Sequence, residues 1–279
     1  MIFDPRPCEL GEGPLWHPLR DQLFWFDITG QRMLSRDDHP QEWRFPRMVS
    51  AAGWVSRDVL LVADECSLFL FDLSTGTATP LADLEADNPV TRSNDGRADP
   101  QGGFWISTMG KSAQPGAGAI YRWYRGELRC LFPGITIPNA ICFPPDGRSA
   151  YFTDTVTRQV MRVALDAQGW PVGQPELFLD LAPEGLNPDG AVIDTQGLMW
   201  LAEWGAARVA AYTPDGARVR TISFDAPHSS CPAFGGDTLY CTTALQGMDA
   251  AARSRYPAAG QTFMAPGVAQ GQAEHQVIL

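Results

Sequence analysis

The chain has 279 residues, with 21 Lys and Arg against 32 Asp and Glu, and a formal net charge of −11. This acidic balance argues against nucleic acids and anionic membranes as partners, because both attract a basic surface. No apolar run approaches the roughly 20 residues of a membrane-spanning helix, and the first residues do not resemble a signal peptide. Six scattered cysteines without a Cys-x-x-Cys pair are typical of reduced thiols. We therefore expect a cytoplasmic protein that contacts neither membrane nor nucleic acid.

Short apolar runs separated by turns occupy most of the chain. They are rich in Phe, Tyr, Trp, Val and Leu, which is typical of β-strands. Six runs stand out: Gln22–Ile28, Val59–Ala63, Gly103–Thr108, Ala150–Asp154, Leu198–Ala202 and Thr238–Thr242. The 27 Gly and 23 Pro are spread between the runs instead of gathering in a linker. One short helix is expected around Met248–Arg255, where Pro257 ends it, so the chain is predicted to be all-β.

The six runs recur with a long period. Their central residues are 36 to 48 positions apart and are Trp25, Leu61, Trp105, Phe152, Trp200 and Tyr240. Turn sequences such as Asp99-Pro-Gln-Gly102 punctuate every unit, because Gly supplies the positive φ that tight turns need. A repeat of four strands in about 40–50 residues is typical of a β-propeller blade, whereas a β-sandwich predicts no such period. We predict a six-bladed β-propeller in which residues 1–279 form a single domain.

Polar side chains recur at one position of the repeat. Eleven to thirteen residues before each central residue stand Glu12, Ser50, Asn94, Asn139, Asp189 and Ser229. Because the first strand of each propeller blade lines the central channel, these side chains are expected to meet at one channel mouth. Carboxylate and amide oxygens are hard ligands suited to Ca²⁺, Mg²⁺ or Mn²⁺, with Zn²⁺ and Fe²⁺ as alternatives. The competing interpretation is that they are ordinary turn and capping residues.

Five motifs, in order between residues 11 and 245, resemble the regucalcin/gluconolactonase (senescence marker protein) family. They are Gly11-Glu12-Gly13-Pro14-Leu15-Trp16, Ser93-Asn94-Asp95-Gly96-Arg97-Ala98-Asp99-Pro100, Pro138-Asn139-Ala140, Pro188-Asp189-Gly190 and Cys231-Pro232-Ala233-Phe234-Gly235-Gly236. The resemblance implies a six-bladed propeller with one divalent metal ion in its channel, and activity on sugar lactones.

The resemblance also implies roles for individual residues. Glu12, Asn139 and Asp189 would ligate the metal ion, and Arg92 and Asn94 would contact the hydroxyl groups of the sugar. A carboxylate beside the metal can take a proton from an attacking water molecule, so Asp189 is the expected general base.

One position departs from the family pattern. Some members place a Glu just after a Thr-Met pair to bind a substrate hydroxyl, whereas here Thr108-Met109 is followed by Gly110 and Lys111. Lys111 is the candidate replacement, as a donor to a hydroxyl or to the lactone ring oxygen. The alternative interpretation is a solvated loop lysine.

These features predict a metal-dependent sugar lactonase that hydrolyses a neutral, gluconolactone-like aldono-1,4- or 1,5-lactone to the aldonic acid. Two alternatives share the residues: a metal-dependent esterase or phosphotriesterase, and a non-catalytic propeller that binds calcium or another ligand. Neither a Gly-x-Ser-x-Gly elbow, a His-Glu-x-x-His motif, a phosphate-binding Gly-rich loop nor an EF-hand loop occurs. Trp204 is a further candidate for the pocket rim, and His228 for contact with substrate.

Overall fold

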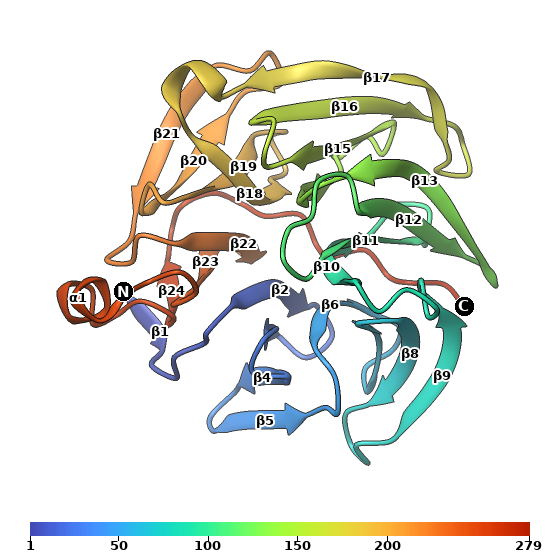
Figure 1. The fold of residues 1–279 in the computed structure, drawn as a ribbon, viewed down its shortest axis with the longest axis horizontal. Helices are drawn as coiled ribbons and strands as arrows, with labels where there is room; N and C mark the ends of the chain where they lie inside the picture. The colour runs from blue at the N-terminus through green and yellow to red at the C-terminus, as the bar shows by residue number, and fades with distance from the viewer.

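Six four-stranded antiparallel sheets surround a central channel in the computed structural model, which describes residues 1–279. Figure 1 looks along this channel, with the innermost strands β2, β6, β10, β18 and β22 labelled around the centre. The predicted all-β, six-bladed β-propeller is therefore confirmed. No helix of the structure has the length and apolar character needed to span a membrane.

The first three blades follow one another in chain order. Blade 1 contains β2 (Gly11–His17), β3 (Gln22–Asp27), β4 (Arg32–Arg36) and β5 (Pro40–Arg44). Blade 2 contains β6 (Val49–Trp54), β7 (Val59–Asp64), β8 (Ser67–Asp72) and β9 (Ala78–Asp83). Blade 3 contains β10 (Thr91–Ala98), β11 (Phe104–Gly110), β12 (Gly118–Tyr124) and β13 (Glu127–Ile135).

The remaining blades repeat this order, and the last one closes the ring. Blade 4 contains β14 (Pro138–Cys142), β15 (Ser149–Asp154), β16 (Gln159–Leu165) and β17 (Pro171–Asp180), and the 3₁₀ turn Ala182–Glu184 follows it. Blade 5 contains β18 (Asn187–Ile193), β19 (Met199–Trp204), β20 (Arg208–Tyr212) and β21 (Arg218–Ser223). Blade 6 contains β22 (Ser229–Gly235), β23 (Thr238–Thr243), β24 (Thr262–Ala265) and β1 (Ile2–Asp4).

The apolar runs found in the sequence form the second strand of each blade: β3, β7, β11, β15, β19 and β23. These strands are buried between neighbouring blades, and the side chains of Trp25, Trp105 and Trp200 are fully buried there. Burial on both faces explains why the strands read as nearly continuous apolar runs without alternation. The predicted turn segments join each of them to the innermost strand of the same blade.

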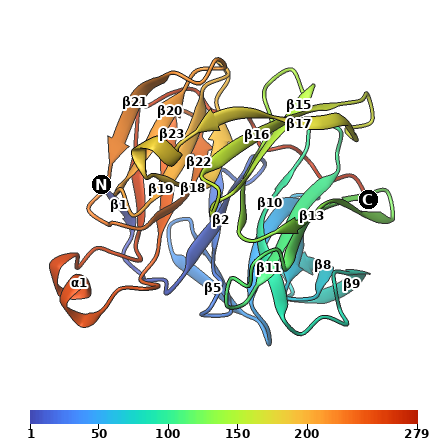
Figure 2. The same cartoon turned by 45° about the horizontal axis from the view of Figure 1, so that its top comes forward.

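Near the chain ends, one strand pairing was not expected from the sequence pattern, and the expected short helix is present with a later start. Strand β1 pairs with β24, with Ile2 opposite Phe263, so the N-terminal strand completes the sixth blade. Helix α1 (Ala250–Arg255) starts later than the expected Met248 because the Asp249 side chain caps it, accepting a hydrogen bond of 2.8 Å from Ala252 N–H. Figure 2 shows α1 standing out at the edge of the propeller.

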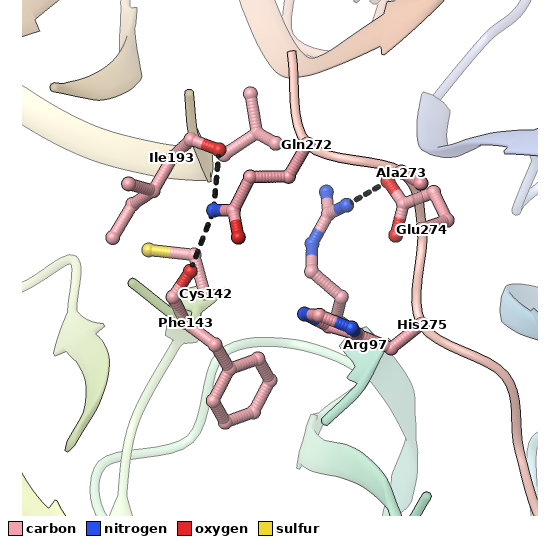
Figure 3. Close-up of a pocket in the computed structure, with 9 residues that line it drawn as sticks. Arg97, Cys142, Phe143, Ile193, Gln272, Ala273, Glu274 and His275 are labelled. Carbon is pink, nitrogen blue, oxygen red and sulfur yellow. Dashed lines mark hydrogen bonds and ion pairs between the residues drawn. The ribbon is translucent and has the colours of Figure 1, made fainter. Parts of the chain in front are cut away.

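The last residues, 266–279, form a segment that we call the C-terminal strap. Figure 1 shows it crossing the middle of the propeller from blade 6 toward the side of blade 3. It contacts the C-terminal ends of the innermost strands: the Gln272 side chain donates to the carbonyls of Phe143 and Ile193, at 3.1 and 2.8 Å. Arg97 forms a buried ion pair with Glu274 (Figure 3). The cavity left there is only about 20 Å³, room for one water molecule, so the strap covers this mouth of the channel.

Candidate active site

The six polar positions singled out in the sequence all lie on the innermost strands, near the mouth opposite the strap. Four of them line a single cavity of about 430 Å³: Glu12, Asn94, Asn139 and Asp189. Ser50 and Ser229 are buried and do not line it. The volume falls within the range of small-molecule pockets. The expected ring of six polar groups is therefore a cluster of four, drawn from blades 1, 3, 4 and 5.

A β-bulge accompanies each of these positions. The pairing register shifts between Glu12 and Leu15 in blade 1, between Asn139 and Cys142 in blade 4, and between Pro188 and Ala191 in blade 5. The innermost strands of the other three blades carry equivalent shifts. A bulge adds a residue to one strand and re-aims the neighbouring side chains. The sequence therefore uses local breaks in pairing to position polar groups at the channel.

Gly13 permits the bulge beside Glu12. Its φ is +53°, in the left-handed region that favours glycine. A Cβ atom at this position would lie 2.2 Å from the carbonyl oxygen of Ser50 in the next blade. Only glycine fits this close approach, which explains why Gly follows the carboxylate in the sequence.

Glu12 and Asp189 are buried carboxyls with few partners. Glu12 accepts one hydrogen bond, from Gly13 N–H at 3.1 Å, and the Asp189 side chain has no protein hydrogen-bond partner. Burial, together with the charge of Asp95, raises the pKa of Glu12 to about 8. Burial and the charge of Glu12 also raise the pKa of Asp189 well above its ordinary value. The charge of Arg92 offsets only part of this rise, and neither carboxyl forms an ion pair within the chain.

Asn139 belongs to a directed chain of hydrogen bonds. Arg92 Nη1 donates to Asn94 Oδ1 at 2.8 Å, and Asn94 Nδ2 donates to Asn139 Oδ1 at 3.0 Å. Asn139 Nδ2 then donates to Thr155 Oγ1 at 3.0 Å, and this hydroxyl donates to the carbonyl of Pro188 at 2.8 Å. A guanidinium can only donate, so it fixes the orientation of both amides along the chain. Asn139 Oδ1 keeps one free acceptor site beside the cavity.

Arg92 is buried at the wall of the same cavity. Its Nη1 also donates to the carbonyl of Ser93 at 2.7 Å, whereas its Nε and Nη2 groups have no protein partner. Burial lowers the pKa of Arg92 to about 10, although the charges of Glu12, Glu65 and Asp189 act in the opposite direction. The guanidinium therefore stays protonated near neutral pH and has donors free for a ligand.

The donor set fits a hard divalent cation. No three His, Cys, Asp or Glu side chains gather into a metal-binding group anywhere in the chain, so a cation here would need an amide oxygen as third ligand. Asn139 Oδ1 is such an oxygen, held in place by Asn94. The two poorly partnered carboxyls of Glu12 and Asp189 supply two further oxygen ligands and negative charge, as Ca²⁺, Mg²⁺ or Mn²⁺ prefer.

The sequence profile of the SMP-30/gluconolactonase/LRE-like region matches residues 10–245. The chain belongs to this family. This confirms the resemblance drawn from the five sequence motifs.

Relatives within the SMP-30/gluconolactonase/LRE-like family span nearly the whole chain. A Rhizobium meliloti protein provisionally named a sugar lactone lactonase is 44% identical, covering 91% of this chain and 89% of its own. An L-arabinolactonase of Azospirillum brasilense is 34% identical, covering 95% of this chain and 90% of its own. The solved structure of regucalcin from Agrobacterium tumefaciens, described as a calcium-binding protein, superposes with a TM-score of 0.97 at 38% identity, covering 100% of this chain and 97% of its own.

Of the three remaining candidate residues from the sequence, two line the cavity and one does not. Lys111 and Trp204 line it, whereas His228 does not. The His228 ring instead stacks on Trp204, with ring centroids 4.3 Å apart and planes within 9°. His228 thus packs behind the cavity wall in this family member.

Some lining residues carried no signal in the sequence. The rest of the wall consists of Leu10, Met109, Ser112, Ala113, Ile137 and Gln246, of which Leu10, Met109 and Ile137 add apolar surface. They come from strand ends and loops of different blades, and neither turn chemistry nor spacing distinguishes them. Met109 appeared in the sequence analysis only as part of the Thr108-Met109 pair, without a role at the cavity.

Proposed function

We propose that this chain is a metal-dependent sugar lactonase that opens an aldono-1,4- or 1,5-lactone to the aldonic acid. The observation that supports it most is the convergence of Glu12, Asp189 and the oriented amide oxygen of Asn139 on one cavity of about 430 Å³. The names of the Rhizobium and Azospirillum relatives support a lactone as the substrate. Two poorly partnered buried carboxyls are costly in a purely structural scaffold, which argues against a propeller without a bound cation.

In this proposal Glu12, Asn139 and Asp189 hold the cation. The chemistry that a divalent cation supplies when bound is Lewis-acid polarisation of the lactone carbonyl, a contribution of several kcal/mol. Glu12 is a ligand only, because Gly13 N–H already occupies one of its oxygens.

Asp189 acts as the general base. It has no protein hydrogen-bond partner, so one carboxylate oxygen is free to take a proton from the water that attacks the carbonyl carbon. The bond between that carbon and the ring oxygen then breaks, and the ring oxygen leaves as a hydroxyl group after it takes up a proton. The product is the open-chain acid, which ionises and releases one proton to solvent.

Arg92, Asn94 and Lys111 position the sugar. The free Nε and Nη2 donors of Arg92 suit hydroxyl oxygens of the substrate. Both N–H groups of Asn94 are already used, on the Pro138 carbonyl at 2.9 Å and on Asn139 Oδ1. Asn94 therefore contributes to substrate only through the remaining acceptor site of its Oδ1, and it mainly orients Asn139.

A panel of aldonolactones tests the proposal. Gluconolactone, xylonolactone, arabinonolactone and galactonolactone are supplied to chelator-stripped protein with each divalent ion added back, and proton release is followed in weakly buffered dye solution. Spontaneous hydrolysis is subtracted. At least one lactone is expected to open faster than the uncatalysed rate with at least one ion. Uncatalysed rates for every combination would reject the lactonase proposal and favour an esterase or a non-catalytic propeller.

A further inference from the structure

An ion pair between two blades stands at the wall of the cavity. Lys111, directly after β11 in blade 3, lines the cavity, and its Nζ lies 2.6 Å from Glu65 Oε2. Glu65 belongs to the turn between β7 and β8 in blade 2. The Lys111 ammonium is therefore neither free in solvent nor free to meet a ligand as an unopposed positive charge.

Both partners are held by further contacts. Glu65 Oε1 accepts a hydrogen bond of 3.1 Å from Met48 N–H, so both oxygens of this carboxylate are engaged. Lys111 N–H donates to the carbonyl of Val90 at 2.9 Å, which fixes the backbone at the start of the loop. Burial raises the pKa of Glu65, but the hydrogen bonds from Lys111 and Met48 outweigh it and leave the pKa below its ordinary value. The Glu65 carboxylate is thus ionised at neutral pH.

This pair sets the charge of one side of the cavity. Four charged side chains line the cavity: Glu12, Asp189, Arg92 and Lys111. The two carboxyls face the proposed cation, and Arg92 Nη1 is occupied by Asn94 and the Ser93 carbonyl. The charge of Arg92 is opposed by Glu12 and Asp189, the two carboxyls of the cavity itself. The Lys111 ammonium is opposed by Glu65, which cancels its charge while leaving its other N–H groups able to donate.

We propose that Glu65 is a specificity-determining residue that acts by neutralising and positioning Lys111. Wild-type protein then accepts a neutral, hydroxyl-bearing substituent at this side of the cavity and discriminates against a carboxylate or sulfonate there. This inference rests on the proposed lactonase function, because it assigns the substrate class of that same site.

The test compares two lactones that differ in one substituent. D-Glucono-1,4-lactone carries a terminal hydroxymethyl group, and D-glucaro-1,4-lactone carries a carboxylate in its place. In Glu65→Gln the unopposed ammonium should raise the ratio of kcat/KM for the glucarolactone to that for the gluconolactone by roughly tenfold, the scale of one charge-assisted hydrogen bond. The rise should shrink in high salt, which screens the new attraction. The double variant Glu65→Gln/Lys111→Met should lose the rise.

Binding of the products gives a readout that does not need turnover. Calorimetric titration with glucarate and gluconate should show a similar rise in the affinity for glucarate relative to gluconate in Glu65→Gln. The role of Glu65 can therefore be tested even if no lactone is hydrolysed. Glu127→Gln is the matched control, because Glu127 pairs with Arg129 on the outermost strand of the same blade as Lys111, away from the cavity. Its ratio should equal that of wild type.

Two outcomes would overturn the inference. One is a Glu65→Gln protein with wild-type thermal stability and unchanged glucarate-to-gluconate ratios in both assays. The other is a gain that persists in the double variant, since the charge responsible would then not be Lys111. Failure of wild-type protein to hydrolyse any lactone would instead reject the proposed function, and the calorimetric comparison would still decide the role of Glu65.

Discussion

Replacing Asn94 by Ala removes the link that orients Asn139. The variant loses two N–H donations, to the Pro138 carbonyl at 2.9 Å and to Asn139 Oδ1 at 3.0 Å, and it leaves Arg92 Nη1 with the Ser93 carbonyl alone. Each unpaired buried polar group costs about 1–3 kcal/mol. If Asn139 Oδ1 is a cation ligand, the free energy of cation binding should be weakened by at least one such cost. We therefore expect the cation affinity and kcat/KM to fall by roughly 5- to 150-fold, at about 1.4 kcal/mol per tenfold.

Calorimetric cation titration and initial-rate kinetics on the same protein preparation measure this effect. Gln272→Ala is the matched control, because it removes an amide that donates to two carbonyls at the opposite mouth of the channel. The control should lower thermal stability without changing cation affinity. A folded Asn94→Ala protein with wild-type cation affinity and wild-type kinetics on every lactone would refute the positioning role of Asn94.

Three further predictions concern pH and the strap. Because the pKa of Glu12 is about 8 without a cation, cation binding at pH 7 should release protons. Calorimetry in buffers of different ionisation enthalpy measures this release. Equal heats of binding in all buffers would contradict it. The native state then binds more protons than the unfolded chain, so the stability of cation-free protein should fall as pH rises from about 4.5 to about 8. Glu274→Ala leaves Arg97 buried without its ion-pair partner and should lower the free energy of unfolding by about 3–5 kcal/mol, seen as a lower melting temperature. Unchanged melting would show that the strap does not stabilise the channel.

Regular spacing made the fold and the site positions predictable from sequence. The second strand of each blade is buried on both faces, so its central aromatic residue, or Leu61 in blade 2, marks the repeat. The innermost strand precedes it by one short turn, and a count back of eleven to thirteen residues therefore reached Glu12, Asn139 and Asp189. The same count also selected Ser50 and Ser229, which are buried outside the cavity, because position on a strand does not reveal which way a bulge turns the side chain.

Features that depend on contacts between distant segments were not predictable in this way. Strand β1 carries only three residues, and nothing in them indicates pairing with β24, more than 250 positions away. The strap lacks strand periodicity, and its role depends on burial of Glu274 against Arg97. The partner of Lys111 is equally hidden, since Glu65 lies in a turn of another blade.

Metal content of the variants tests the central claim most directly. Wild type, Glu12→Ala and Asp189→Ala are equilibrated with the activating divalent ion, dialysed, and analysed by elemental mass spectrometry alongside a measurement of protein concentration. The proposed site should hold about one ion per chain in wild type and strongly less in both variants, because each variant would lose one of its two carboxylate ligands. Full occupancy in both folded variants would contradict a cation site built from Glu12, Asn139 and Asp189.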